Sequence, residues 1–267
     1  MALAVRAALR RRLSLTALLL LTACSPTRGV PIFLWHSVGE GNLGDPYDLT
    51  ADEFDRQLDL LDRWGAHPVT LDRLFDALEG KAKLPERAVV LTFDDGRMCQ
   101  RTEVLPLLAK HHFVAETFVV SSFLRPDAAR RFVEHDAHGA HPMLTWPELS
   151  QMAASGVFSV ESHGRTHRSF HALSAAEQKR EVLLSRAELK LGLHRPVDFF
   201  SYPFGAFEWG SRNLVEQAGY RAAFSVSKNL STRFAIHRVS IARDQTPSLE
   251  AALRDAYGSP PSTSTKR

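Results

Sequence analysis

Seven short apolar runs are spread along the chain, and segments with a helical pattern separate most of them. The runs are rich in Val, Ile and Phe and lie at 30–38, 88–93, 116–122, 157–162, 197–204, 222–226 and 234–242. Their apolar character is continuous, without the strict alternation that marks a strand with one solvated face. This pattern predicts strands that are covered on both sides, as in a parallel sheet.

Three predicted helices begin with a hydroxyl residue three positions before a glutamate, the pattern of a capping box. These pairs are Thr50 with Glu53, Thr145 with Glu148, and Ser174 with Glu177. Helical segments are predicted at 51–64, 71–79, 101–112, 145–155, 174–192 and 209–218. Strands that alternate with helices over most of the chain are typical of a parallel α/β domain, and the length suits a (β/α) barrel. We therefore predict one domain at 30–257 and a disordered tail at 258–267, which has little apolar surface.

The first residues have the pattern of a secretory signal. Four arginines precede an apolar run at 13–21, which is too short for a comfortable membrane span. The following "LTAC", ending at Cys24, resembles the lipobox of bacterial lipoproteins, in which cleavage precedes a cysteine that becomes lipidated. We expect a lipoprotein signal peptide at 1–23 and a short tether at 24–29, with an ordinary signal peptide as the alternative. The expected location is an exported protein anchored to the bacterial membrane through Cys24, and Ser25 resembles the residue choice of outer-membrane lipoproteins.

Charge and cysteine content restrict the partners and the cross-links. The chain has 33 basic and 30 acidic residues, and removing residues 1–23, which hold four arginines and no acids, leaves 29 against 30. The basic character belongs to the signal segment, so the sequence does not predict a nucleic-acid partner. With Cys24 acylated, Cys99 is the remaining thiol and an internal disulfide is excluded; we expect Cys99 to be a small core residue.

Polar residues at the ends of the apolar runs are the candidates for chemistry, because active sites of parallel α/β sheets lie beyond the carboxyl ends of the strands. The candidates are His36, the adjacent Asp94 and Asp95, the pair His163 and His167, and "SYPFG" at 201–205. Adjacent strand residues point to opposite faces, so the two aspartates share a site only if the chain leaves the strand there, as a following glycine permits. Two close carboxylates repel unless a cation or a strong hydrogen-bond donor absorbs their charge, and a metal is the simplest answer.

The two histidines stand four residues apart directly after a predicted strand, so one helical turn would bring both imidazoles to one side. The sequence is not the HExxH of a zinc protease, because no glutamate follows His163. Taken alone, this spacing also fits surface histidines in a chain with 12 of them.

Three motifs taken together are more specific. "TFDDG" at 92–96, "SHGRTH" at 162–167 and "YPFG" at 202–205, in this order, resemble the motifs of the polysaccharide deacetylases, the NodB-homology or carbohydrate esterase family 4 group. The resemblance implies a distorted (β/α) barrel that removes N-acetyl groups from an N-acetylglucosamine-containing polysaccharide, either an exopolysaccharide or a cell-envelope glycan. It implies Asp94 as the catalytic base and a divalent metal, zinc with cobalt, nickel or iron as alternatives. The implied metal ligands are Asp95, His163 and His167.

The resemblance also implies the groups that handle the substrate. The backbone N–H of Phe204, aimed by Pro203 and next to Tyr202, would stabilise the oxyanion. The early "PIFLWHSV" at 31–38 resembles the branch that deacetylates the β-1,6-linked N-acetylglucosamine polymer of biofilms, and it implies His36 as general acid. The rival for that role is His237, at the position where other branches supply the acid.

Two departures from the family pattern leave questions open. Gly164 replaces the Ser or Thr that usually follows the first metal histidine, so a hydrogen bond that orients this ligand is either missing or supplied by Thr166. An arginine that is common just before the Pro-aromatic pair is replaced by Ser201 or Tyr202, so the group that supports Asp94 is undefined. Five aromatic residues near strand ends are candidate sugar-stacking walls: Trp35, Tyr202, Phe204, Phe207 and Trp209.

Three other functions compete with this interpretation. Two histidines and a carboxylate also form the facial triad of non-haem iron oxygenases, but those enzymes usually place it on antiparallel strands. A glycoside hydrolase needs two carboxylates that straddle the scissile bond, for which adjacent aspartates are poorly placed. The third alternative is a lipid-anchored carbohydrate-binding protein that keeps the fold without turnover.

Overall fold

The computed structural model describes residues 27, 29–41, 44–228 and 231–261. The predicted signal peptide and Cys24 lie outside the described residues, and so does the end of the tail at 262–267. Among the helices of the described ranges, none combines the length and the apolar character that a membrane crossing requires.

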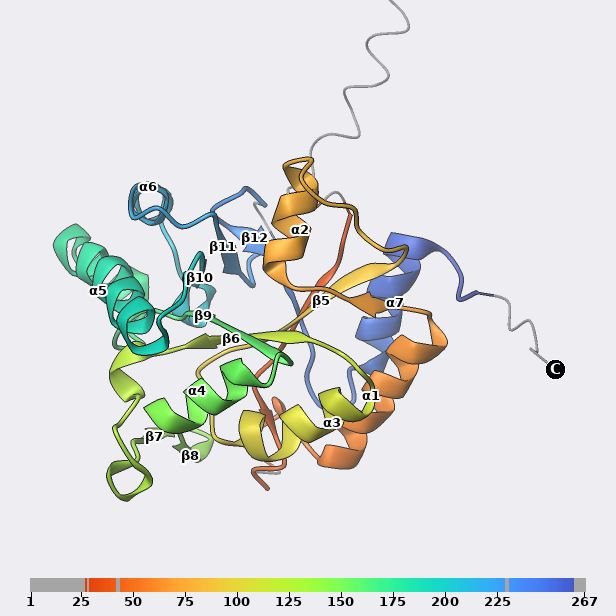
Figure 1. Cartoon of the computed structure of the whole chain (residues 1–267), viewed down its shortest axis with the longest axis horizontal. Helices are drawn as coiled ribbons and strands as arrows, with labels where there is room; N and C mark the ends of the chain where they lie inside the picture. The colour runs from red at the N-terminus through yellow and green to blue at the C-terminus, as the bar shows by residue number, and fades with distance from the viewer. Residues whose placement is uncertain (1–26, 28, 42–43, 229–230, 262–267) are drawn as a thin grey trace, which may run out of the picture.

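A parallel sheet curls until it is nearly closed into a barrel, and helices surround it (Figure 1). The strand order is β12-β11-β10-β9-β6-β5-β1-β13, with β4 paired to β5. The strands are β1 Ile32–Trp35, β4 His67–Pro68, β5 Ala88–Phe93, β6 Ala115–Val119, β9 Phe158–Ser162, β10 Phe199–Ser201, β11 Ala222–Ser225, β12 Ile236–His237 and β13 Val239–Ser240. Only Arg238 separates β12 from β13 along the chain, yet these strands lie at opposite ends of the order, so this segment bridges the two edges of the sheet. The predicted parallel (β/α) barrel is confirmed.

Both faces of the strands are covered by apolar side chains, which explains the continuous apolar runs. One cluster of buried residues includes Ile32, Val90, Phe118, Phe199, Phe224 and Ile236 and fills the interior of the barrel. The neighbouring strand positions, such as Phe33, Leu91 and Val119, belong to a second cluster together with residues of the helices. Because alternate residues enter opposite clusters, the strand period determines which polar side chains at the strand ends point into the barrel.

The helices follow the predicted positions with one addition. They are α1 Ala51–Arg63, α2 Leu71–Leu78, α3 Leu105–Lys110, α4 Trp146–Ala154, α5 Ala175–Leu193, α6 Trp209–Gln217 and α7 Thr246–Tyr257. The three predicted capping boxes are present at the starts of α1, α4 and α5. The segment predicted at 101–112 opens with a π-helical turn, Gln100–Val104, before α3 begins. Helix α7 was not predicted; it buries Leu249 and Leu253, and it packs beside α1.

Two predicted strands, at 30–38 and at 234–242, are interrupted, and a hairpin appears where no strand was expected. The run at 30–38 ends its barrel strand at Trp35, and β2 Ser37–Val38 then pairs with β3 Asp48–Leu49 in a separate sheet. His36 therefore stands where the chain leaves the barrel. The hairpin is formed by β7 Val133–Asp136 and β8 Gly139–Pro142.

The two remaining predictions concern Cys99 and the tail. Cys99 is a free, buried thiol, as expected of a core residue. At the start of the tail, the carbonyl of Ser259 accepts a hydrogen bond of 2.9 Å from Arg87, so this part of the segment contacts the domain.

Candidate active site

A cavity of about 350 Å³ opens at the carboxyl ends of the barrel strands. Residues that follow six of the barrel strands, β1, β5, β9, β10, β11 and β12, contribute to its wall, which is the place expected for the active site of a parallel barrel. The lining residues are Leu34, His36, Asp45, Tyr47, Asp94, Asp95, Arg97, Asp136, His138, His163, His167, Phe204, Gly205, Val226, Arg238 and Ser240. The structure thus brings together the predicted base, the three predicted metal ligands and His36.

The two adjacent aspartates share this cavity because the chain turns sharply after β5. Asp95 has a φ of +74° and Gly96 a φ of +80°, both in the left-handed region. A Cβ at position 96 would lie 2.9 Å from Cγ1 of Val119, so the turn requires glycine there for space as well as for conformation. The strand rule that would point the two carboxylates apart no longer applies.

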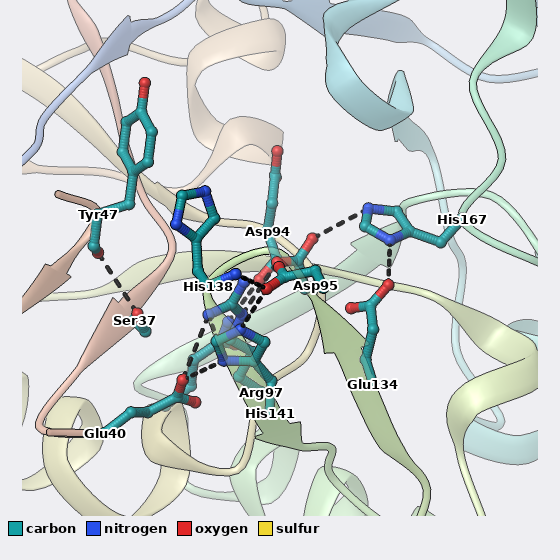
Figure 2. A network of polar contacts seen from close by, with 12 residues as sticks. Ser37, Glu40, Tyr47, Asp94, Asp95, Arg97, Glu134, His138, His141 and His167 are labelled. Atoms are coloured by element: carbon teal, nitrogen blue, oxygen red, sulfur yellow. Dashed lines mark hydrogen bonds and ion pairs between the residues drawn. The ribbon is translucent and has the colours of Figure 1, made fainter. Parts of the chain in front are cut away.

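One oxygen of Asp95 faces two imidazoles, and the other is bound by an arginine. The Oδ1 atom lies 3.3 Å from Nε2 of His167 and 3.6 Å from Nε2 of His163, while Oδ2 accepts a hydrogen bond of 3.1 Å from Nε of Arg97. Figure 2 shows Asp95 between His167 and Arg97. The ligand atoms of Asp95, His163 and His167 all lie within 4.8 Å of one another, so the three residues can hold one metal ion.

The other ring nitrogen of each histidine has an acceptor, which leaves both Nε2 atoms directed at the site. The Nδ1 of His163 lies 2.9 Å from the carbonyl oxygen of Ser201, and the Nδ1 of His167 lies 2.6 Å from Oε1 of Glu134. This is the arrangement that orients metal-binding histidines in proteins. The donor set, two imidazoles and a carboxylate with their outer partners in place, fits a divalent transition metal.

Without a metal, the carboxylates around the histidines determine their protonation. Burial alone would lower the pKa of His167, but hydrogen bonds to Asp95 and Glu134 raise it to about 10. Burial lowers the pKa of His163 below its ordinary value, in spite of the charge of Asp94. Burial would raise the pKa of Asp95, but the bond to His167 and the charge of Arg97 hold this pKa well below its ordinary value. A cation that binds here therefore competes with a proton on His167.

The first departure from the family pattern has a structural explanation. Gly164 has a φ of +80°, and a Cβ there would lie 3.3 Å from Oε2 of Glu181, so glycine suits this turn. The hydroxyl of Thr166 donates to Glu181 and does not reach His163, whose Nδ1 partner is the carbonyl of Ser201. The orienting hydrogen bond of this histidine is therefore supplied by the backbone.

The second departure from the family pattern also has a structural explanation. Arg238, which lies between β12 and β13, supports Asp94. Arg238 donates from Nη1 to Oδ1 at 2.8 Å and from Nη2 to Oδ2 at 2.6 Å, and Ser201 donates its hydroxyl to Oδ2 at 3.2 Å. Burial alone would raise the pKa of Asp94, but the charge of Arg238 lowers it below its ordinary value. The carboxylate is thus held ionised and fixed in orientation.

The two candidates for the general acid occupy different surroundings. His36 lines the cavity, its ring centroid is 5.2 Å from that of Tyr47, and burial lowers its pKa although Asp95 and Asp94 raise it. Within the described ranges, its buried Nδ1 has no hydrogen-bond partner. His237 does not line this cavity, because the adjacent Arg238 points into the barrel and successive strand residues alternate.

Of the predicted substrate-handling residues, Phe204 reaches the cavity. It is 66% exposed, and its ring stacks on His167 with centroids 4.8 Å apart. Pro203 is buried, and Tyr202 is buried in the core with its hydroxyl bound to the carbonyl of Phe234. The remaining predicted aromatic walls do not line this cavity: Trp35 is a core residue, Phe207 packs against the core and Trp209 is exposed beside Arg212.

Sequence reasoning missed Arg97, Glu134 and Arg238. Arg97 stands two residues after Asp95, and its charge was a signal that the sequence offered. Arg238 follows His237 in the apolar run at 234–242, where a long cationic side chain requires a buried partner. Glu134 lies in a polar segment with no apolar pattern, so nothing marked it.

A family profile described as polysaccharide deacetylase matches residues 81–223. The Bacillus subtilis protein YxkH, whose name assigns it provisionally to these deacetylases, is 25% identical over 232 residues, which are 85% of this chain and 75% of that protein. The poly-beta-1,6-N-acetyl-D-glucosamine N-deacetylase of Escherichia coli K12 is 25% identical over 84% of this chain, and the match spans 38% of that protein.

Solved structures show the same fold. The de-N-acetylase from Aggregatibacter actinomycetemcomitans superimposes with a TM-score of 0.72 and 21% identity, covering 84% of this chain and 99% of that chain. IcaB from Ammonifex degensii superimposes with a TM-score of 0.70 and 23% identity, covering 85% of this chain and 97% of that chain. Because the family profile matches more than half of the chain, the chain belongs to the polysaccharide deacetylase family.

Proposed function

We propose that the protein is a metal-dependent hydrolase that removes N-acetyl groups from an N-acetylglucosamine-containing polysaccharide and releases acetate. The observation that carries this proposal is that the two adjacent aspartates contact different partners. Asp95 directs one oxygen at the imidazoles of the two histidines, whereas Asp94 is bound by Arg238 beside them. In such a site one carboxylate can bind a cation, and the other stays ionised and can accept a proton. This combination suits hydrolysis of an amide.

Asp95, His163 and His167 would hold the cation. A divalent ion bound there would lower the pKa of a water molecule and polarise the acetamide carbonyl. Zinc suits this donor set, and cobalt, nickel and iron are the alternatives.

The protein's own groups would move the protons. Asp94, ionised at neutral pH, would accept a proton from water as the new C–O bond forms. His36 would donate a proton to the nitrogen as the C–N bond breaks, so that the products are acetate and an amine. We propose the backbone N–H of Phe204 as a donor to the developing oxyanion.

The proposed substrate is a polymer of N-acetylglucosamine. The E. coli and Staphylococcus aureus relatives are named for the β-1,6-linked polymer, which supports this linkage as the first to assay. The exposed ring of Phe204 beside His167 offers a face on which a sugar could stack. A cell-envelope glycan is the second substrate to test.

We also propose that the protein is exported and anchored to the membrane through a lipid on Cys24. This proposal depends on the arginines, the apolar run and the lipobox-like "LTAC" of the sequence. Metabolic labelling with a fatty-acid analogue, compared with Cys24→Ala, tests it directly.

Acetate release from N-acetylglucosamine oligomers tests the proposed activity. Metal-loaded protein is expected to release acetate, a chelator should abolish the release, and added zinc should restore it. Binding of the oligomer by metal-loaded protein without acetate release would contradict the proposal and favour the carbohydrate-binding alternative. Oligomers with β-1,6 and β-1,4 linkages, assayed side by side, distinguish the two glycan classes.

Replacing each candidate acid tests the role of His36. His36→Ala is expected to lower the rate of acetate release by about 10²–10⁴-fold, the usual contribution of a general acid. His237→Ala, the matched control from outside the cavity wall, should change the rate little. If instead His237→Ala inactivates the enzyme while His36→Ala does not, the acid belongs to the late strand.

A further inference from the structure

The hairpin of β7 and β8 lies outside the barrel sheet, yet one of its cross-strand pairs faces the candidate metal centre. Glu134 on β7 is directly opposite His141 on β8 in the antiparallel register. Residues that are directly opposite in such a pair project from the same face of the hairpin. Both side chains reach residues around Asp95 and His167, as Figure 2 shows.

Glu134 contacts one of the candidate metal ligands. Its Oε1 lies 2.6 Å from Nδ1 of His167, on the opposite side of the ring from the Nε2 that faces Asp95. A carboxylate in this place fixes the ring and keeps the proton on Nδ1, so the lone pair stays on Nε2. His167 has a φ of +59°, so its backbone is in an uncommon conformation and the ring needs support from outside its own loop.

His141 is connected to a second candidate ligand, Asp95, through Glu40 and Arg97. Its Nδ1 donates to Oε2 of Glu40 at 2.6 Å, and the same oxygen accepts a hydrogen bond of 3.3 Å from Nη1 of Arg97; all three side chains are largely buried. Arg97 in turn binds Oδ2 of Asp95, so that Oδ1 is the oxygen left facing the imidazoles. A buried arginine held by Glu40, which His141 in turn holds, fixes the carboxylate better than an exposed one could.

Backbone hydrogen bonds attach the hairpin to the loop that carries Asp95. The N–H of Met98 donates to the carbonyl of Pro142 at 2.8 Å, and the N–H of Leu144 donates to the carbonyl of Gly96 at 2.9 Å. On the β7 side, Phe132 stacks on Phe123 with ring centroids 4.2 Å apart. Main-chain hydrogen bonds therefore fix the position of the hairpin against the loop that carries Asp95.

We propose that Glu134 and His141 are positioning residues and that this one rung of the hairpin sets the orientation of two of the three metal ligands. The inference rests on the metal site of the proposed function. It predicts that the hairpin determines metal affinity although neither residue belongs to the ligand set. Had the hairpin served only as a wall of the cavity, replacing either residue would leave metal affinity unchanged.

The test is the dissociation constant for Zn²⁺, measured on metal-free protein by competition with a chromophoric chelator. Glu134→Ala and His141→Ala are each expected to weaken binding by about 10–100-fold, the usual effect of removing such an outer partner. Glu134→Gln, whose amide oxygen can still accept from Nδ1, should recover part of the affinity. His135→Ala is the matched control, because His135 is exposed on the other face of the same strand and should leave the affinity unchanged.

Two further measurements separate orientation from folding. Thermal unfolding of the metal-free variants should match the wild type within a few degrees, and the visible spectrum of the Co²⁺-loaded Glu134→Ala protein should differ from that of the wild type. Wild-type Zn²⁺ affinity in both alanine variants would overturn the inference and leave the proposed function standing. A wild-type protein that binds no Zn²⁺ would overturn both.

Discussion

Asp94→Asn is expected to reduce acetate release by about 10²–10⁴-fold while the affinity for Zn²⁺ changes little. The amide has nearly the shape of the carboxylate but cannot accept the proton of the attacking water. The ligand atoms of Asp95, His163 and His167 do not depend on the replaced group. Acetate release and chelator competition, measured on the same preparation, provide the two readouts.

The adjacent aspartate is the control for this prediction. Asp95→Asn should lose most of the Zn²⁺ affinity and, with it, the activity. Reversed results, with metal lost from the Asp94 variant and kept by the Asp95 variant, would show that the roles of the two aspartates are exchanged. Because Asp94→Asn also leaves Arg238 without its ionic partner, a lower Tm is expected, and assays should be run well below it.

Much of this centre was predictable because its parts follow strand ends. A continuous apolar run that stops at "DDG" indicates a buried strand with carboxylates at its carboxyl end, and parallel strands bring such ends together. The same reasoning placed His163 and His167 beside Asp95, and the structure brings their ligand atoms together. Local patterns sufficed here because strand direction alone determines which ends meet.

The supporting groups were harder to predict because their partners are distant in the chain. Arg238 and Asp94 are 144 residues apart, and their contact depends on how the last strands close the barrel. Strand alternation could still have helped, since Arg238 and His237 must point to opposite faces and only one of them can enter the barrel. The contact of Glu134 with His167 depends on a hairpin made of polar residues, for which the apolar pattern gives no signal.

Arg238→Met is expected to lower the free energy of unfolding by about 3–5 kcal/mol, the usual cost of leaving a buried charge without its partner. Methionine preserves much of the volume over the ring of Phe118, so the loss reports mainly on the charge of Asp94. Arg238→Lys keeps the charge without the two parallel hydrogen bonds, so its free energy of unfolding should lie between those of Arg238→Met and the wild type. Arg254→Met is the control, because Arg254 forms an exposed ion pair with Glu250 and should cost less than about 1 kcal/mol.

The same replacement should change how activity depends on pH. In the wild type the charge of Arg238 lowers the pKa of Asp94 against the effect of burial, so the base stays ionised as the pH falls through the weakly acidic range. In Arg238→Met the largest effect that opposes burial is gone, so the pKa of Asp94 rises relative to the wild type and the acidic limb of the rate profile should move to higher pH. Zn²⁺ affinity measured at each pH separates protonation of the base from loss of metal. An acidic limb that stays in place, with metal still bound, would contradict the view that Arg238 keeps the pKa of Asp94 low.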